Sequence, residues 1–264
     1  MRFAGSVAVT VAAMVVPDAH VQAQQPLVSD RPGFTEATST VGRGIAQIEF
    51  GYTFGLDRSN GARVHAHSLG EPLLRLGLLA DWLELRVAVP PVAQRMPLDG
   101  SSSTESGLDD LYLGAKLALS EQNGGFPALA ILPQATVPTG SEAFSSDEVL
   151  PGVNVLYGWD LSDAVSLTGS TQVNRVVGVS GNAMAEWAQS VSWGRALGAR
   201  HGLYAEWFAT FQEDSELRQA EHYFNTGLAW HITDNLQWDV RVGFGLNDDT
   251  EDFFLGTGLS VRIR

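Results

Sequence analysis

The chain has 264 residues, of which 44% are hydrophobic, and its mean hydropathy of +0.00 is too low for a helical membrane protein. The formal net charge of −14 argues against a nucleic-acid partner, because phosphate contacts need a basic surface. Cysteine is absent, which excludes disulfide bonds and cysteine-ligated metals.

The first 23 residues have the pattern of a secretory signal peptide. A short positively charged start precedes an apolar run over 3–16, and the triplet "VQA" at 21–23 reads as a small-x-small cleavage site. The apolar run is too short for a membrane-spanning helix, and no run of about 18 apolar residues follows it. The sequence therefore predicts an exported protein whose mature chain begins near Gln24.

The segment 24–43 precedes the first predicted strand and is rich in turn-forming residues. Two interpretations are open. The segment is either a mobile periplasmic tail, as chain termini often are, or a plug that folds into the interior of the following domain. In the second case, Asp30 and Arg31 would pair with charges in that interior.

From Gly44 onward, short runs alternate apolar and polar residues, which is the period of a β-strand with two different faces. In "NLQWDVRVGFGL" (235–246), large apolar residues such as Trp238 take one parity, whereas Asp239 and Arg241 take the other. About ten residues are enough for a tilted strand to cross a bilayer. Twelve runs of roughly this length and pattern occur, at 44–54, 63–79, 82–89, 110–119, 128–137, 149–160, 165–175, 184–195, 203–212, 223–232, 236–246 and 253–263.

The connections between these runs alternate between short and long. Residues 80–81, 162–164 and 233–235 form short links, whereas long polar links cover 90–109, 138–148, 213–222 and 247–252. This alternation predicts a single all-β domain over 44–264, an up-and-down antiparallel transmembrane β-barrel with short periplasmic turns and longer extracellular loops. A soluble β-sandwich, the alternative, has no reason to sort its connections in this way.

Charged residues share the parity that is expected to face the lumen of this barrel. A cationic side chain that faces lipid at the membrane midplane costs about 2–4 kcal/mol, so these residues cannot lie on the outer face. Two interpretations, which are not exclusive, are the selectivity filter of a polar pore and an ion-pair network that fills a narrow barrel. The candidates are Glu49, Arg75, Glu84, Arg86, Lys116, Glu186, Glu206, Asp239, Arg241 and Arg262.

The sequence predicts no metal site and no catalytic site. His65 and His67 are expected to share the inward parity of one strand, but no third ligand stands at the spacing of a metal site. Ser68 is adjacent to His67, so the two side chains would point to opposite faces and could not form a hydrolase pair. The acidic connections 213–222 and 247–252 lack the glycine and terminal glutamate of a calcium loop and are expected to form a solvated rim.

Four stretches resemble one family. They are "LVSDRPGFTEATSTVGRGIAQIEFGYTF" (27–54), "PLLRLGLLADWLELRV" (72–87), "GLDDLYLGAKLAL" (107–119) and "PTG" (138–140). The family is the bacterial outer-membrane family labelled as a component of the meta pathway of phenol degradation, whose members are commonly called transporters. The resemblance implies an outer-membrane barrel that passes small, hydrophobic or aromatic molecules. One departure is the terminal "LSVRIR", because many outer-membrane barrels end on an aromatic residue that serves in assembly recognition.

These observations predict a passive channel or transporter of the outer membrane with no enzymatic activity and no cofactor. Its expected partners are outer-membrane lipid and lipopolysaccharide, the barrel-assembly machinery and a small-molecule cargo. Two alternatives are a structural or adhesive barrel that acts through its long loops and, from a different class, an outer-membrane lipid hydrolase.

Overall fold

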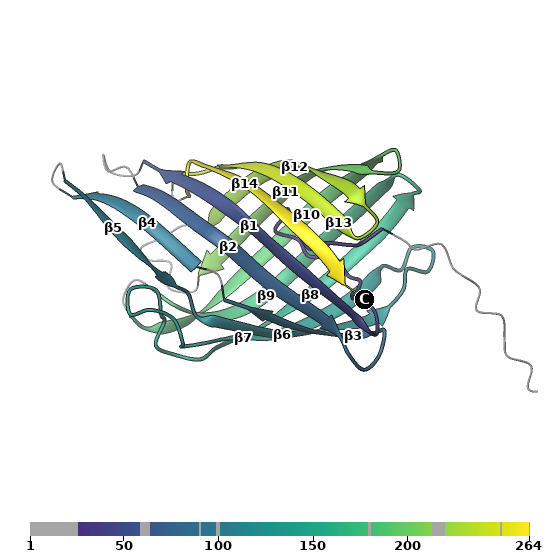
Figure 1. Cartoon of the computed structure of the whole chain (residues 1–264), viewed down its shortest axis with the longest axis horizontal. Helices are drawn as coiled ribbons and strands as arrows, with labels where there is room; N and C mark the ends of the chain where they lie inside the picture. Colours follow the sequence, from purple (N-terminus) through teal and green to yellow (C-terminus); the bar gives the residue numbers. More distant parts are fainter. Residues whose placement is uncertain are drawn as a thin grey trace, which may run out of the picture.

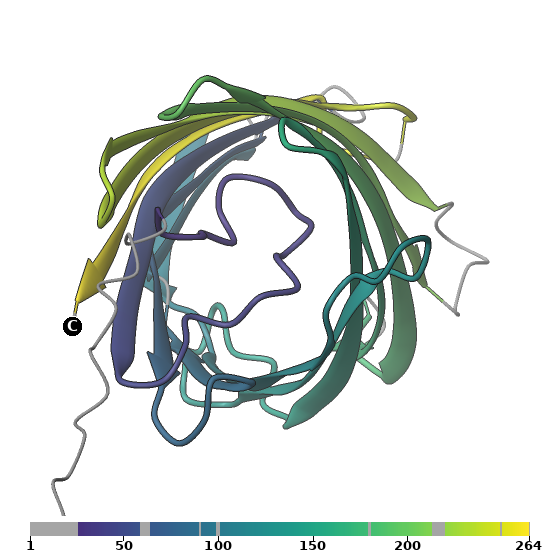
Figure 2. The same cartoon turned by 90° about the vertical axis from the view of Figure 1, so that its right-hand side faces the viewer.

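The computed structural model describes residues 26–58, 64–89, 91–98, 101–178, 181–212, 220–248 and 250–263. They form one closed barrel of antiparallel strands, seen from the side in Figure 1 and from one end in Figure 2. Within these ranges, no helix is long and apolar enough to cross a membrane. The strands are β1 (Ile45–Asp57), β2 (Val64–Gly77), β3 (Leu83–Ala88), β4 (Pro91–Leu98), β5 (Ser101–Leu108), β6 (Leu111–Ser120), β7 (Ala128–Val137), β8 (Leu150–Ser162), β9 (Val165–Val177), β10 (Ala183–Leu197), β11 (His201–Gln212), β12 (Glu221–Thr233), β13 (Leu236–Gly245) and β14 (Phe253–Ile263).

The barrel closes because β1 pairs on one side with β2 and on the other with β14. The β1–β14 ladder runs from Ala46 opposite Ile263 to Leu56 opposite Phe253. Since β3 and β4 both pair with β2, they are two halves of one barrel strand, and β5 with β6 forms the next. The fourteen labelled strands therefore make a twelve-stranded barrel, and the predicted fold class is confirmed.

The prediction of a long loop over 90–109 is wrong. Most of this stretch continues the two neighbouring barrel strands outward as the β4–β5 hairpin, with Pro91 opposite Leu108 and Leu98 opposite Ser101. The hairpin extends at the left end of the barrel in Figure 1. The sequence hides it because the proline pair at 90–91 and the serine run at 101–103 interrupt the apolar alternation.

Alternation places polar side chains on the inner face of the barrel wall. On β13, Gln237 and Asp239 are buried, whereas Trp238 and Phe244 are 39% and 45% exposed on the outer face. This is the reverse of a soluble protein, in which apolar side chains fill the interior. The pattern is typical of a barrel whose outer surface faces lipid.

A β-bulge in β2 reverses the parity of its first half. Glu49 of β1 stands opposite Leu73, but Gly51 stands opposite Gly70, so β2 contains one extra residue at this point. Gly70 and Glu71 both have positive φ, of 85° and 37°. An extra residue in one strand moves all following side chains to the other face.

The predicted inward orientation of His65 and His67 is therefore wrong. His67 Nδ1 lies 2.8 Å from the hydroxyl of Tyr52, and both histidine rings contact Phe54, on the outer face of β1. Counting alternate residues back from the inward-facing Arg75 gives the wrong face for both histidines, because the count crosses the bulge.

Residues 26–43, which we call the plug segment, run inside the barrel. Figure 2 shows the segment as a purple loop that crosses the space enclosed by the strands. The segment meets β1 at the end of the barrel where the short turns after β8, β10 and β12 and the end of β14 also lie.

Candidate functional site: a plugged barrel lumen

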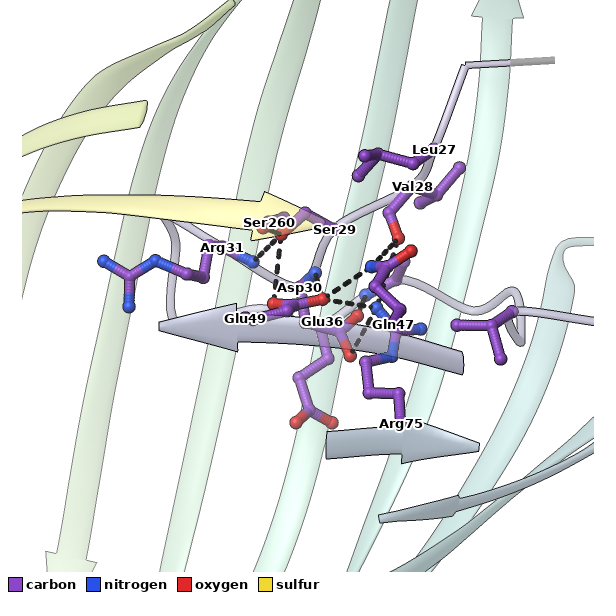
Figure 3. Close-up of polar contacts among 12 residues, drawn as sticks. Leu27, Val28, Ser29, Asp30, Arg31, Glu36, Gln47, Glu49, Arg75 and Ser260 are labelled. Carbon is purple, nitrogen blue, oxygen red and sulfur yellow. Dashed lines mark hydrogen bonds and ion pairs between the residues drawn. The ribbon is translucent and has the colours of Figure 1, made fainter. Parts of the chain in front are cut away.

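Asp30 of the plug segment lies among three cations of the barrel wall. Figure 3 shows one of them, Arg75, near Asp30 and Glu49. The Asp30 carboxylate is 3.3 Å from the Arg75 guanidinium, 3.0 Å from that of Arg86 and 3.0 Å from Lys116 Nζ. Lys116 also donates to the carbonyl oxygen of Ala37, at 2.8 Å. These wall groups come from β2, β3 and β6, and so one carboxylate ties the plug segment to three neighbouring strands.

Arg75 is fully buried at the centre of this cluster. Its guanidinium contacts Glu49 and Glu84 at 2.8 Å each and donates to the carbonyl oxygen of Val28. Arg86 in turn contacts Glu36 of the plug segment at 2.9 Å. We call the seven ionic residues the Asp30 cluster; they are Asp30, Glu36, Glu49, Arg75, Glu84, Arg86 and Lys116.

The charges of the Asp30 cluster complement one another across the lumen. The wall contributes three cations and two carboxylates, Glu49 and Glu84, and therefore carries one surplus positive charge. The plug segment supplies the other two carboxylates, Asp30 and Glu36. Buried charges are tolerated only when they are paired and hydrogen-bonded, so the wall needs the plug segment to satisfy its cations.

Arg31 forms a second attachment, on the opposite side of the segment. Its guanidinium contacts Glu71 at 2.9 Å and Asp239 at 3.4 Å. Gly51 and Gly258 lie beneath it, and a Cβ atom at either position would collide with the guanidinium. The absence of side chains there makes room for Arg31 against the wall.

Glu206 of β11 forms a third attachment. Its carboxylate accepts hydrogen bonds from the backbone N–H groups of Phe34 and Thr35, both at 2.7 Å, and from the side chain of Asn225. The Phe34 ring stacks on Phe208 with a centroid separation of 4.5 Å. The plug segment is thus held on several sides of the barrel.

Aromatic rings line one part of the inner wall. From the stacked pair of Phe34 and Phe208, the contacts continue to Tyr223, 4.7 Å from Phe208, and then to Phe254, 6.3 Å from Tyr223. The guanidinium of Arg241 lies 5.5 Å from the centre of the Phe254 ring. We call Phe34, Phe208, Tyr223 and Phe254 the aromatic ladder. It leads from the outer ends of β12 and β14 down to the plug segment.

The structure brings most of the predicted lumen residues to the plug segment. Five of the ten belong to the Asp30 cluster, Glu206 and Asp239 bind the segment elsewhere, and Arg241 donates to the carbonyl oxygen of Pro32. Glu186 lies nearer the outer rim, where it accepts a hydrogen bond from Gln212. Arg262 lies at the other end, where it donates to Asn235 in the β12–β13 turn.

Sequence reasoning missed Glu36, Glu71 and the inward-facing aromatic rings. Glu71 belongs to the bulge, which simple alternation does not reveal. Phe208 has the same parity as Glu206, two residues earlier, and this shared parity was the available signal. Within the described part of the chain, no three His, Asp or Glu side chains are grouped in a way that could hold a metal ion.

Asp110, between β5 and β6, holds the extracellular loop 138–149. Its carboxylate accepts hydrogen bonds from the backbone N–H groups of Thr139, Gly140 and Ser146, and from the Ser146 hydroxyl at 2.6 Å. Burial alone would raise the pKa of Asp110, but the hydrogen bonds from Ser146 and Gly140 outweigh this effect and lower the pKa well below the usual 3.8.

We expect Asp110→Asn to make loop 138–149 several times more sensitive to protease at pH 7, because an amide accepts fewer hydrogen bonds than a carboxylate. A group whose pKa is lowered by folding stabilises the folded state above its unfolded pKa, about 3.9, and loses that effect as the pH falls through the folded value. The wild-type loop should therefore stay protected from pH 7 down to about pH 4. Glu142→Gln, an exposed change in the same loop, is the control; equal cleavage of both variants would contradict the role of Asp110.

Comparison with solved structures finds the same barrel architecture. A COG4313 outer membrane channel from Pseudomonas putida F1 superposes with a TM-score of 0.69 at 16% identity, covering 88% of this chain and 99% of that one. The KdgM porin in complex with disordered oligogalacturonate gives 0.52 at 9% identity, covering 83% and 99%. The translocator domain of the autotransporter NalP from Neisseria meningitidis gives 0.54 at 10% identity, covering 84% and 89%. At these identities the likeness establishes the fold, that of bacterial outer-membrane barrels.

Among curated proteins, no sequence matches. A family model described as "Putative MetA-pathway of phenol degradation" matches residues 29–263, which includes the plug segment from Ser29 onward as well as the barrel. The chain therefore belongs to this family.

Proposed function

We propose that this chain is a passive channel of the bacterial outer membrane for small, hydrophobic or aromatic molecules, and that the plug segment restricts its lumen. The barrel fold supports the membrane setting, and the family description mentions phenol degradation. Export by a signal peptide over 1–23 stays a prediction, because those residues lie outside the described part of the chain.

The aromatic ladder is the observation that carries the proposal. The ladder gives the lumen an aromatic strip, and each contact between an aromatic solute and one of its rings is worth about 0.5–1.5 kcal/mol. Because Phe208 already stacks on both Phe34 and Tyr223, a solute would contact the edges of the rings as it passes along the strip. Phe34 of the ladder and Asp30 of the cluster belong to the same plug segment, so that an aromatic surface and a charged surface face the same lumen.

An enzymatic role has little support in the geometry. The bulge turns Ser68 inward, opposite Thr53, whereas His67 faces outward, so this serine and histidine cannot act as a hydrolase pair. A barrel of this kind also has no energy source of its own, which is consistent with passive passage. If the folded protein carries no current, an adhesive or structural role becomes the expected function.

Current through the refolded protein in a planar bilayer tests the proposal, with phenol as the probe. We expect stable current steps that phenol blocks reversibly. Tyr223→Leu removes one ring of the ladder and should weaken the block about two- to tenfold, given the worth of one aromatic contact. Tyr223 stacks on Phe208 on the side of the ladder away from the plug segment, so the change should leave the hydrogen bonds and ring contact of Phe34 in place.

The matched control is Phe224→Leu, because Phe224 is the next residue and lies on the outer face of the same strand. Its phenol block should equal that of the wild type. A folded protein that gives no current steps would reject the channel. Equal block in Tyr223→Leu and wild type would reject the ladder as the path of aromatic solutes.

A further inference from the structure

A cavity of about 460 Å³ lies between the plug segment and the wall formed by β6–β9. The last part of the plug segment, residues 38–42, forms one side of it, and Ala118, Gly158 and Thr168 are among the wall residues on the other. The cavity is at the end of the barrel where the short turns lie, which is the periplasmic end of an outer-membrane barrel.

Where it borders the cavity, the plug segment is attached to the β2–β3 side of the barrel, away from β8 and β9. Val41 N–H donates to Glu84 at 2.9 Å, and the Thr40 hydroxyl donates to the carbonyl oxygen of Asp81. Both acceptors belong to the β2–β3 side of the barrel. On the other side, Thr38 approaches Gly158 so closely that a Cβ atom there would be in contact with it, at 3.6 Å. The cavity lies beside this contact, between residues 38–42 and the wall.

The cavity has acidic walls. Asp81, Glu121 and Asp160 line it, and its lining contains no lysine, arginine or histidine. Two cations lie close by. Arg43, the last residue of the plug segment, is exposed to solvent. Lys116 stands one inward-facing position from Ala118 but is already bound to Asp30. The lining therefore has an excess of negative charge.

We propose that this cavity is the periplasmic exit of the pore, and that Asp81, Glu121 and Asp160 make it favour cationic and neutral solutes over anions. The inference rests on the proposed channel function. Carboxylates in a confined aqueous space concentrate cations and repel anions, and such fields change local concentrations by about tenfold or more. Aromatic cargo would then leave the barrel more readily as a neutral molecule, such as a phenol, than as a carboxylate.

Thiol labelling tests this exit, because the chain contains no cysteine and a single introduced one is unambiguous. Thr168→Cys places a thiol in the cavity wall, and Ala199→Cys places one on the exposed β10–β11 turn as a control. At each position we compare the modification rate by a cationic trimethylammonium methanethiosulfonate with the rate by the anionic sulfonate reagent. The ratio of the cationic to the anionic rate should be about tenfold higher at position 168 than at position 199.

Adding Glu121→Gln and Asp160→Asn to Thr168→Cys should bring the ratio of rates close to that of the control. Modification of position 168 should also reduce the single-channel current. Failure of both reagents to modify position 168, or modification without any change in current, would overturn the exit. Equal rates for the two reagents would overturn the charge preference.

These failures are distinguishable from failure of the proposed function. If the unmodified wild type carries current while modification of position 168 leaves the current unchanged, the channel stands and only the exit is rejected. If the folded wild type carries no current, the channel itself is rejected, together with the exit that depends on it.

Discussion

Replacing Asp30 by alanine is expected to free the plug segment and raise the single-channel current several-fold. The change leaves Arg75, Arg86 and Lys116 buried without the carboxylate that they share. Lys116 loses the only carboxylate partner that the described residues provide within 4 Å. Removing one member of a buried ion pair typically costs about 3–5 kcal/mol, because the remaining charge stays desolvated.

This cost destabilises the state in which the plug segment is bound in the lumen, and not the fold of the barrel. When the plug segment leaves the wall, water can solvate the three cations, so the change favours the open lumen. A shift of about 3 kcal/mol multiplies the open population more than a hundredfold. The measurement is the distribution of current levels in a planar bilayer, with protease sensitivity of residues 26–43 as an independent readout of release.

Two further variants make the result specific. Ser29→Ala removes hydrogen bonds to Glu49 and Ser260 from the neighbouring position but leaves every charged group in place, and it should change the current much less. Asp30→Asn combined with Lys116→Met removes a cation together with the carboxylate and should recover part of the wild-type behaviour. A protein with Asp30→Ala that keeps wild-type current levels and a protected plug segment would contradict the role of Asp30.

The strands were predictable because alternation is a local property. Each run such as 236–246 carries its own inward and outward faces, and repetition of the pattern is enough to indicate a barrel. Alternation also identified the charged lumen residues without any knowledge of the neighbouring strands. It failed at β2, where one extra residue at Gly70–Glu71 reverses the parity of His65 and His67. It failed again over 91–108, where the strands continue through a stretch without apolar periodicity.

The partners of the plug segment were less accessible to sequence reasoning. Arg31 meets Asp239, 208 residues further along the chain, and Thr35 meets Ser190, 155 residues away. Such pairs depend on barrel closure and on the path of a segment that has no regular secondary structure. Asp30 and Arg31 were nevertheless identified as candidates, because charged residues in a turn-rich segment beside a charged lumen have few other partners.

Replacing Arg75 by methionine is expected to destabilise the barrel itself. Arg75 is fully buried and bridges Glu49 of β1 to Glu84 of β3, and it also contacts the carbonyl oxygen of Val28. Without it, the two carboxylates on the strands that flank β2 lose the cation that they share. We expect the free energy of unfolding to fall by about 3–5 kcal/mol, measured by urea unfolding in lipid or detergent.

Arg175→Met is the matched control for this loss. Arg175 also forms an ion pair, with Glu148 at 2.8 Å, but both side chains are about half exposed. An exposed pair of this kind contributes about 0–1 kcal/mol, so the control should unfold nearly as the wild type does. Arg75→Lys keeps the charge but cannot donate to Glu49 and Glu84 at once through a planar fork, and its stability should be intermediate.

The same variants separate the two interpretations of the lumen charges. If the charges form an ion-pair network that holds strands and plug segment together, Arg75→Met changes stability strongly, and adding Glu84→Gln restores part of it, because one unpaired carboxylate is then removed. If the charges instead act mainly as a selectivity filter, Arg75→Met would unfold like Arg175→Met and would shift the reversal potential in a salt gradient. The burial of Arg75 and its contacts with Asp30, Glu49 and Glu84 favour the network, because a filter must expose its charges to the permeating ion.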